Sequence, residues 1–152
     1  MADRFFDTSA VAKHYRAEVG TARVDALLAE AGARHLISAL SVVELHSVFA
    51  RLVRTGQITA ADFHLARGRF LADVAAGLWQ VLPVSAAHFH DAQQLLVRHG
   101  LVHSLRTLDA LQLAVALGCS APGPLDAFVC ADTNLLHVAA AEGLTVLNPE
   151  VP

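Results

Sequence analysis

Hydrophobic positions along the chain alternate between short apolar runs and longer segments with helical periodicity. The apolar runs predict strands over residues 4–6, 35–38, 80–84, 127–131 and 144–147. The longer segments predict helices from residue 8 or 9 to about 16 and over 22–30, 42–55, 60–78, 86–99, 106–117 and 133–142. Strands that alternate with helices pair in parallel and are covered on both faces. The pattern therefore predicts a three-layer α/β/α fold with a central parallel sheet of four to five strands.

Small polar residues and glycines mark the expected helix boundaries. The side chains expected to cap helix starts are those of Thr8 or Ser9, Ser41, Thr59 and Ser85. Gly56 and Gly100 follow helices at positions that favour left-handed backbone. The proline and glycine residues over 120–124 predict a turn. The chain contains no repeat and no linker, so the sequence predicts one domain over residues 1–152.

Composition and charge narrow the class of protein. Hydrophobic residues make up 55% of the chain and charged residues 16%, which excludes disorder and indicates a large interior or an interface. No apolar run approaches the roughly 18 residues of a membrane span, and the N-terminus does not resemble a signal peptide. We therefore expect a cytoplasmic location without membrane contact. A net charge of −3 argues against a general nucleic-acid coat, although a small nuclease stays possible.

Four acidic residues carry the main chemical signal. Asp7, Glu44, Asp109 and Asp132 each stand where an apolar segment gives way to a turn or helix. A buried carboxylate is costly unless it is paired or binds a metal. Asp7 and Asp132 follow strands, and functional sites in parallel sheets lie at the carboxyl ends of strands. Convergence of all four would require a divalent cation, and oxygen ligands suit Mg²⁺ or Mn²⁺.

Each acid also has a structural interpretation that the sequence leaves open. Asp7 and Asp132 can serve as N-caps, and Glu44 can be an exposed acid favoured by the helix dipole. In the site interpretation, Asp7 and Asp109 bind the metal directly, and Glu44 and Asp132 bind it directly or through water. Capping and metal binding can coexist at Asp132.

Four ordered motifs, spread over essentially the whole chain, resemble a known family. The first is Phe6–Lys13, and the second joins Ile37-Ser38 to Val43-Glu44-Leu45 and Ala50-Arg51. The third is Asp109–Ala114, and the fourth is Phe128–Leu135, closed by residues 139–144 and Asn148-Pro149. Together they resemble the PIN domain family, and within it the VapC toxins of bacterial VapBC toxin–antitoxin pairs.

The resemblance implies a function and partners. It implies a metal-dependent endoribonuclease that hydrolyses RNA phosphodiester bonds as the toxin of a type II toxin–antitoxin pair. The catalytic and metal-binding residues would be Asp7, Glu44, Asp109 and Asp132, with Mg²⁺ or Mn²⁺ as the cofactor. The implied partners are an RNA substrate, a cognate antitoxin protein laid over the active site, and a second copy of the chain in a homodimer.

Several further residues are candidates around these acids. Ser9 and Thr107 are expected to orient Asp7 and Asp109, with capping or turn formation as the alternative. Many relatives have another acid where this chain has Asn134, which can ligate a cation without charge and would weaken a second metal site. The loop over residues 119–126 also looks long. The residues that flank the motifs and are candidates for RNA phosphate contacts are Arg51 and Arg106, with Lys13, Arg16 and Arg54 as weaker ones; the alternative for each is a solvated face.

Three other functions compete with the toxin. A PIN-type nuclease for ordinary RNA processing would carry the same motifs. A non-catalytic PIN scaffold would bind RNA or protein, although the presence of all four acids argues against it. A phosphatase of the haloacid-dehalogenase type also begins with an Asp after a strand, but it requires a second Asp two residues later, where this chain has Ser9.

Overall fold

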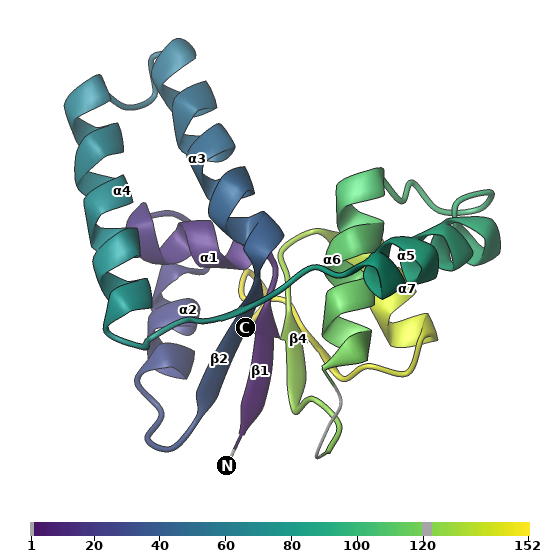
Figure 1. Cartoon of the computed structure of the whole chain (residues 1–152). Helices are drawn as coiled ribbons and strands as arrows, with labels where there is room; N and C mark the ends of the chain where they lie inside the picture. The colour runs from purple at the N-terminus through teal and green to yellow at the C-terminus, as the bar shows by residue number, and fades with distance from the viewer. Residues whose placement is uncertain (1, 120–122) are drawn as a thin grey trace.

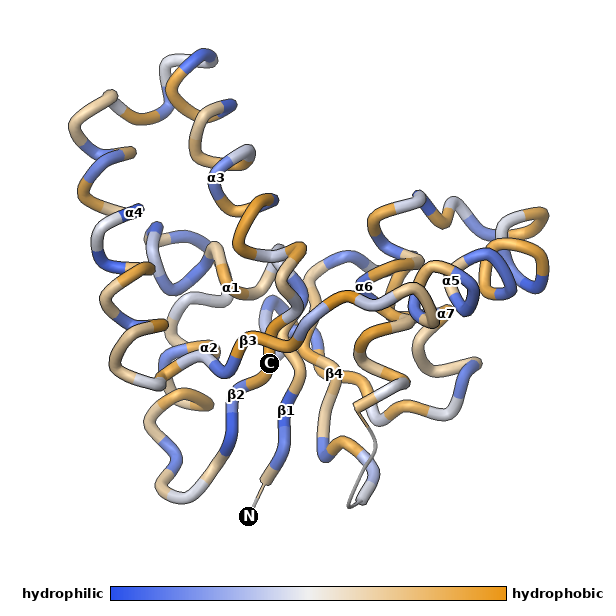
Figure 2. The backbone as a smooth tube through the Cα atoms, viewed as in Figure 1, coloured by the Kyte–Doolittle hydropathy of each residue, from blue (hydrophilic) through white to orange (hydrophobic). Residues whose placement is uncertain are grey.

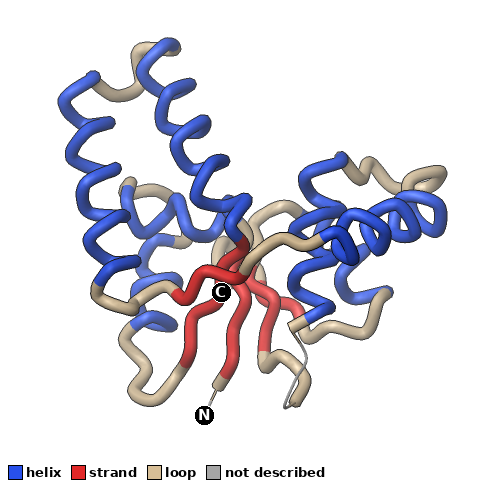
Figure 3. Tube along the Cα trace, in the orientation of Figure 1, coloured by secondary structure: helices blue, strands red, loops and turns tan. Residues whose placement is uncertain are grey.

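A five-stranded parallel sheet forms the centre of the computed structural model, which describes residues 2–119 and 123–152. The strands lie in the order β3-β2-β1-β4-β5, and every pair is parallel (Figures 1 and 3). Their bounds are β1 Asp3–Phe6, β2 Arg34–Ser38, β3 Gln80–Leu82, β4 Ala127–Val129 and β5 Val146–Leu147. The predicted fold class is confirmed.

Seven helices cover the two faces of the sheet in the described part of the chain. They are α1 Thr8–Tyr15, α2 Thr21–Leu28, α3 Ala39–Arg54, α4 Ala60–Ala75, α5 Ala86–His99, α6 Thr107–Gly118 and α7 Thr133–Ala141. Helices α1 to α4 pack on one face, and α5 to α7 pack on the other (Figure 3). The described residues include no helix that is both long and apolar enough to span a membrane.

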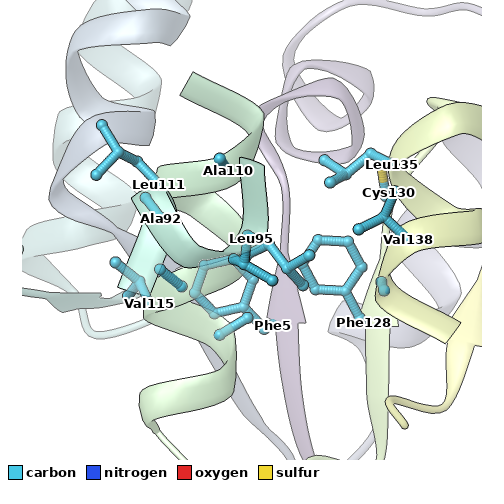
Figure 4. Packing of buried hydrophobic residues seen from close by; sticks show 14 of the residues in the cluster. Phe5, Ala92, Leu95, Ala110, Leu111, Val115, Phe128, Cys130, Leu135 and Val138 are labelled. Atoms are coloured by element: carbon cyan, nitrogen blue, oxygen red, sulfur yellow. The ribbon is translucent and has the colours of Figure 1, made fainter. Parts of the chain in front are cut away.

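Alternating residues of the central strands fill two separate hydrophobic cores. Phe5, Leu36 and Phe128 pack against α5, α6 and α7, and the rings of Phe5 and Phe128 stack with centroids 5.7 Å apart (Figure 4). Their neighbours along the strands, Phe6 and Val129 among them, pack against α1 to α4. Successive strand side chains point to opposite faces, so these strands are hydrophobic where both faces are covered. Figure 2 shows that the hydrophilic residues of β1 and β2 lie at the amino ends of these strands.

Two of the predicted helix caps are wrong. The cap of α1 is Asp7, whose side chain accepts from the Ser9 backbone, rather than Thr8 or Ser9. The N-cap of α3 is Ser38, and Ser41 lies inside this helix with its side chain fully buried. The predicted cap Thr59 is confirmed.

Of the two glycines predicted to end helices with left-handed backbone, one is confirmed and one is wrong. Gly56 follows α3 with a φ of 72°, as predicted. Gly100 has a φ of −67° at the end of α5, so it continues the right-handed backbone instead of the left-handed one expected there. Most of the turn predicted over residues 120–124 falls on residues 120–122, which lie outside the described residues.

Candidate functional site

The four predicted acids line one cleft. Its volume is about 770 Å³, and its walls come from α1, α3, α6 and the turn between β4 and α7. These elements follow or surround the carboxyl ends of β2, β1 and β4, which are neighbours in the sheet (Figure 1). The topology therefore brings together Asp7, Glu44, Asp109 and Asp132 from segments up to 125 positions apart.

Asp7 is buried at the start of α1, with 7% of its surface exposed. Its Oδ2 accepts from the backbone N–H of Ser9 at 3.0 Å and from the Ser9 hydroxyl at 2.7 Å. The same hydroxyl accepts from the backbone N–H of Ala131 at 3.0 Å, so Ser9 links Asp7 to the turn after β4. Burial raises the pKa of Asp7, and the nearby charge of Asp109 raises it further. Asp7 is therefore both the N-cap of α1 and a residue of the cleft.

Glu44 lies in the second turn of α3 and is half-buried. Its Oε1 accepts from Gln112 Nε2 at 2.7 Å and from the Thr8 hydroxyl at 3.1 Å. Burial raises the pKa of Glu44, and the hydrogen bond from Gln112 opposes that shift, whereas the charges of Asp7 and Asp109 add to it. The residue is therefore no exposed first-turn acid, which was the structural alternative.

Asp109 is held by the residue three positions before it. Its Oδ2 accepts from the backbone N–H of Arg106 at 3.3 Å and from Arg106 Nε at 3.0 Å. This pairing raises the pKa of the Arg106 guanidinium. In the described part of the chain no hydrogen bond joins Thr107 to Asp109, and Thr107 is exposed at the first position of α6. Arg106 thus occupies the orienting position for which the sequence suggested Thr107.

Asp132 caps α7 and also faces the cleft. Its Oδ1 accepts from the backbone N–H groups of Asn134 at 2.9 Å and Leu135 at 3.2 Å. Its Oδ2 lies 3.6 Å from a guanidinium nitrogen of Arg106. Asn134 is exposed and does not line the cleft. Capping and site roles therefore coexist at Asp132.

Two polar residues at the site were not singled out from the sequence. Gln112 is 1% exposed in the middle of α6 and touches Glu44. A lone amide within the apolar run 110–117 was the signal that could have identified it. Cys130 is fully buried, and its Sγ lies 3.7 Å from Asp7 Oδ2. Burial raises the pKa of this thiol.

The basic residues near the motifs divide into two groups. Arg16, Arg51, Arg54 and Arg106 line the cleft, and the Arg106 side chain is 75% exposed. Lys13 was a weaker candidate for phosphate contact, but its side chain is only 4% exposed. Its ammonium group is paired with Glu150 at 2.6 Å and Glu18 at 3.3 Å, and it donates to the Val19 carbonyl at 2.8 Å. Lys13 also lines the cleft, but these three contacts occupy its ammonium group, so it holds the C-terminal segment and stays a weak candidate for phosphate contact.

The donor set suits a hard cation. All four acidic side chains offer oxygen ligands, and Arg106 already places one positive charge between Asp109 and Asp132. No three His, Cys, Asp or Glu side chains of the described ranges are arranged around a single point that an ion would fill. Asp109 instead pairs with Arg106, and Asp132 caps the start of α7 and lies near Arg106. An ion at this site would therefore compete with Arg106 for these two carboxylates.

Solved structures resemble the chain over nearly its full length. FitAcB from Neisseria gonorrhoeae is 21% identical, with a TM-score of 0.68 and coverage of 98% of this chain and 99% of that chain. The toxin VapC20 from Mycobacterium tuberculosis, described as cleaving the sarcin–ricin loop, is 20% identical, with a TM-score of 0.67 and coverage of 97% and 98%. A DNA-bound VapBC from Salmonella typhimurium is 17% identical, with a TM-score of 0.59 and coverage of 98% and 99%.

The sequence comparisons give the family. No curated protein sequence matches the chain. The model of the PIN domain family matches residues 4–141, a range that includes all four acids of the cleft. The match extends over well more than half of the chain, and the chain therefore belongs to the PIN domain family.

Proposed function

We propose that the chain, as one domain over residues 1–152, is a metal-dependent endoribonuclease that hydrolyses RNA phosphodiester bonds. One observation carries the proposal: four carboxylates from four separate segments line a single cleft. Two of them, Asp7 and Glu44, have pKa values raised by burial and by the neighbouring negative charges. Such a cluster favours a cation over structural pairing alone.

Asp7, Glu44, Asp109 and Asp132 are proposed to hold Mg²⁺ or Mn²⁺. The ion would neutralise phosphate oxygens and lower the pKa of the attacking water. Ser9 would keep Asp7 oriented through its two hydrogen bonds. Thr107 and Asn134 keep their proposed supporting roles only if their side chains turn toward the cleft, since they do not line it.

RNA is the proposed substrate because arginines flank the acids in the cleft. Arg51 and Arg54 extend along α3 on one side, and Arg106 stands at the start of α6. Guanidinium groups bind phosphate oxygens through paired hydrogen bonds. The RNA phosphates on either side of the cleaved bond would contact these guanidinium groups, while the acids bind the ion. The similar structure of VapC20, described as a toxin that cleaves the sarcin–ricin loop, supports the same substrate class.

The proposed biological role is the toxin of a type II toxin–antitoxin pair. Structural neighbours include toxin–antitoxin complexes from several bacteria, which supports a cognate antitoxin as a partner. We also propose a cytoplasmic homodimer. Large exposed apolar side chains, such as Leu101 and Val102, support a protein interface. Sedimentation velocity of the purified chain tests the dimer, and a monomer at micromolar concentration would contradict it.

Cleavage of a mixed RNA pool in Mn²⁺ tests the activity. The protein is purified under denaturing conditions, to remove any bound partner, and then refolded. Wild type should cleave, EDTA should stop cleavage, and Asp109→Asn should be inactive. The matched control is Asp91→Asn, which changes an exposed acid on α5 and should cleave as wild type does. Cleavage that persists in EDTA or in Asp109→Asn would reject the metal mechanism.

Growth upon expression tests the toxin role separately. Wild type should arrest growth, Asp109→Asn should not, and a protein encoded beside the chain's gene should restore growth when co-expressed. RNA cleavage in vitro without growth arrest would favour a processing nuclease. A folded wild type that binds RNA but cleaves none of it would favour a non-catalytic scaffold.

A further inference from the structure

We propose that Gln112 is a positioning residue that holds the Glu44 carboxylate in place for the metal ion. The inference rests on the proposed function, because it assigns Glu44 a metal-binding role. It adds a residue from the core of α6 to a site otherwise built from acids, and it adds Ser38 as the group that fixes the Gln112 amide.

Burying the Gln112 side chain costs free energy unless its amide is fully hydrogen-bonded. Seven consecutive residues of α6, from 110 to 116, are buried, and Gln112 is the polar one among them. An amide in an apolar interior is tolerated only when its donors and acceptor are hydrogen-bonded. Gln112 meets this requirement entirely through side chains from α1, α3 and the end of β2. The amide therefore connects the core of α6 to the opposite wall of the cleft.

Ser38 determines which way the amide points. The fully buried Ser38 hydroxyl donates to Gln112 Oε1 at 2.7 Å. A hydroxyl in this place satisfies the carbonyl end of the amide and leaves the two hydrogens of Nε2 for the other side. Ser38 is the N-cap of α3, six residues before Glu44. The same short segment thus supplies both the orienting group and the carboxylate.

Three acceptors lie within hydrogen-bond distance of the two Nε2 hydrogens of Gln112. The nearest acceptor is Glu44 Oε1 at 2.7 Å, followed by the Ser41 hydroxyl at 2.9 Å and the Thr8 hydroxyl at 3.1 Å. The Thr8 hydroxyl has one hydrogen and two acceptors, the Ser41 hydroxyl at 3.0 Å and Glu44 Oε1 at 3.1 Å. The bond from Gln112 therefore holds Oε1, and no hydrogen bond from the described residues reaches Oε2. Oε1 is therefore held in the wall of the cleft, and Oε2 remains available to an ion in the cleft that Glu44 lines.

This arrangement is what a metal ligand requires from its supporting groups. A glutamate has three side-chain torsions, and fixing them before the ion arrives reduces the entropic cost of binding. A partner that holds a ligand in this way typically changes metal affinity by about 10–100-fold. Because Gln112 touches only one of the four acids, we expect the lower end of that range.

The test compares Mn²⁺ dissociation constants by titration calorimetry for the refolded protein. Gln112→Met keeps the length of the side chain and removes the amide, and it should raise the dissociation constant about 10-fold. Glu44→Gln should also raise it, and the double variant should match Glu44→Gln within about twofold, since Gln112 acts through Glu44. The control is Leu113→Ala. Leu113 is the buried neighbour of Gln112 on α6 and packs in the hydrophobic core with α5 and α7, so this change should lower stability and keep the Mn²⁺ affinity.

The outcomes separate this inference from the proposed function. Equal Mn²⁺ affinity in wild type and Gln112→Met, or effects of Gln112→Met and Glu44→Gln that multiply in the double variant, would overturn the inference alone. A wild type that binds no Mn²⁺ would overturn both proposals. Should Gln112→Met not fold, Ser38→Ala decides: it leaves Gln112 in place but frees its amide, and an unchanged Mn²⁺ affinity would then reject the positioning role.

Discussion

At the scale of single residues, the site uses side chains that also stabilise local structure. Asp7 and Asp132 cap α1 and α7, and Asp109 pairs with Arg106 at the start of α6. Asparagine caps a helix about as well as aspartate. An Asp→Asn change at Asp7 or Asp132 therefore removes the charge of a proposed metal ligand and retains the helix cap, so these two variants test function with little effect on the helix start.

Asp7→Asn should change the pH dependence of stability in EDTA. The pKa of Asp7 is raised in the folded protein, so its contribution to stability is present below its ordinary pKa and is lost as pH rises through the folded pKa. Wild type should therefore lose stability relative to Asp7→Asn as pH rises above the ordinary carboxyl pKa of about 4. Urea unfolding at several pH values measures the difference between the two proteins, in which contributions of the histidines cancel.

The same variant should cleave RNA at least about 100-fold more slowly, since even groups that support a metal ligand change affinity about 10–100-fold. Wild-type cleavage by Asp7→Asn would remove Asp7 from the site. A stability difference that does not depend on pH would show that the Asp7 carboxyl is not under strain from burial and Asp109.

Arg106→Met should separate metal binding from RNA binding. Arg106 pairs with Asp109 at 3.0 Å and approaches Asp132 at 3.6 Å, so it competes with an incoming ion. Removing its charge should tighten Mn²⁺ binding a few-fold and weaken RNA binding, with a flatter salt dependence from the lost phosphate contact. Calorimetry with Mn²⁺ and RNA binding at several salt concentrations measure the two effects. Weaker Mn²⁺ binding in Arg106→Met would show that Arg106 supports the carboxylates instead of competing for them.

At the scale of elements, hydrophobic periodicity predicted each helix and strand that the described residues form. Capping chemistry predicted the starts of the helices less well. Ser41 and Ser38 both precede apolar helical positions, and a serine can cap or be buried in either place. What decides between them is the point at which β2 turns out of the sheet, which depends on pairing with β1 and β3. Local sequence does not contain that information, so the boundary was predicted three residues late.

Lys13→Met should loosen the C-terminal segment. The Lys13 ammonium group joins α1 to Glu150 and to the Val19 carbonyl before α2. Its loss removes the charged hydrogen bonds of a nearly buried ammonium group to Glu150 and to the Val19 carbonyl, at a cost of about 1–3 kcal/mol of unfolding free energy. The exposed Arg23 provides the matched control, and Arg23→Met should change stability by less than about 0.5 kcal/mol. Equal urea midpoints for the two variants would contradict a structural role for Lys13.

At the scale of the whole molecule, the site arises from topology. The acids at strand ends, Asp7 and Asp132, were placed correctly because parallel strands end on one edge of a sheet. Glu44 and Asp109 were identified through ordered motifs instead, since nothing local to a helix shows which face meets the cleft. The contacts of Gln112 with Thr8 and Ser41 were not predictable, because they depend on how α1, α3 and α6 meet around the strand ends.

Mn²⁺ should stabilise the whole molecule if the cleft binds it as proposed. An ion that binds only the folded state at about 100 times its dissociation constant adds about 2.7 kcal/mol to the free energy of unfolding. The gain should increase as pH rises, because Asp7 and Glu44, whose pKa values are raised, then become more fully ionised and repel each other more strongly. Urea unfolding with and without Mn²⁺ measures it, and Asp7→Asn/Asp109→Asn is the control that should show little gain. Equal stabilisation of wild type and the control would place the ion elsewhere on the protein, and the four carboxylates would then have to be explained by their hydrogen bonds and by Arg106 alone.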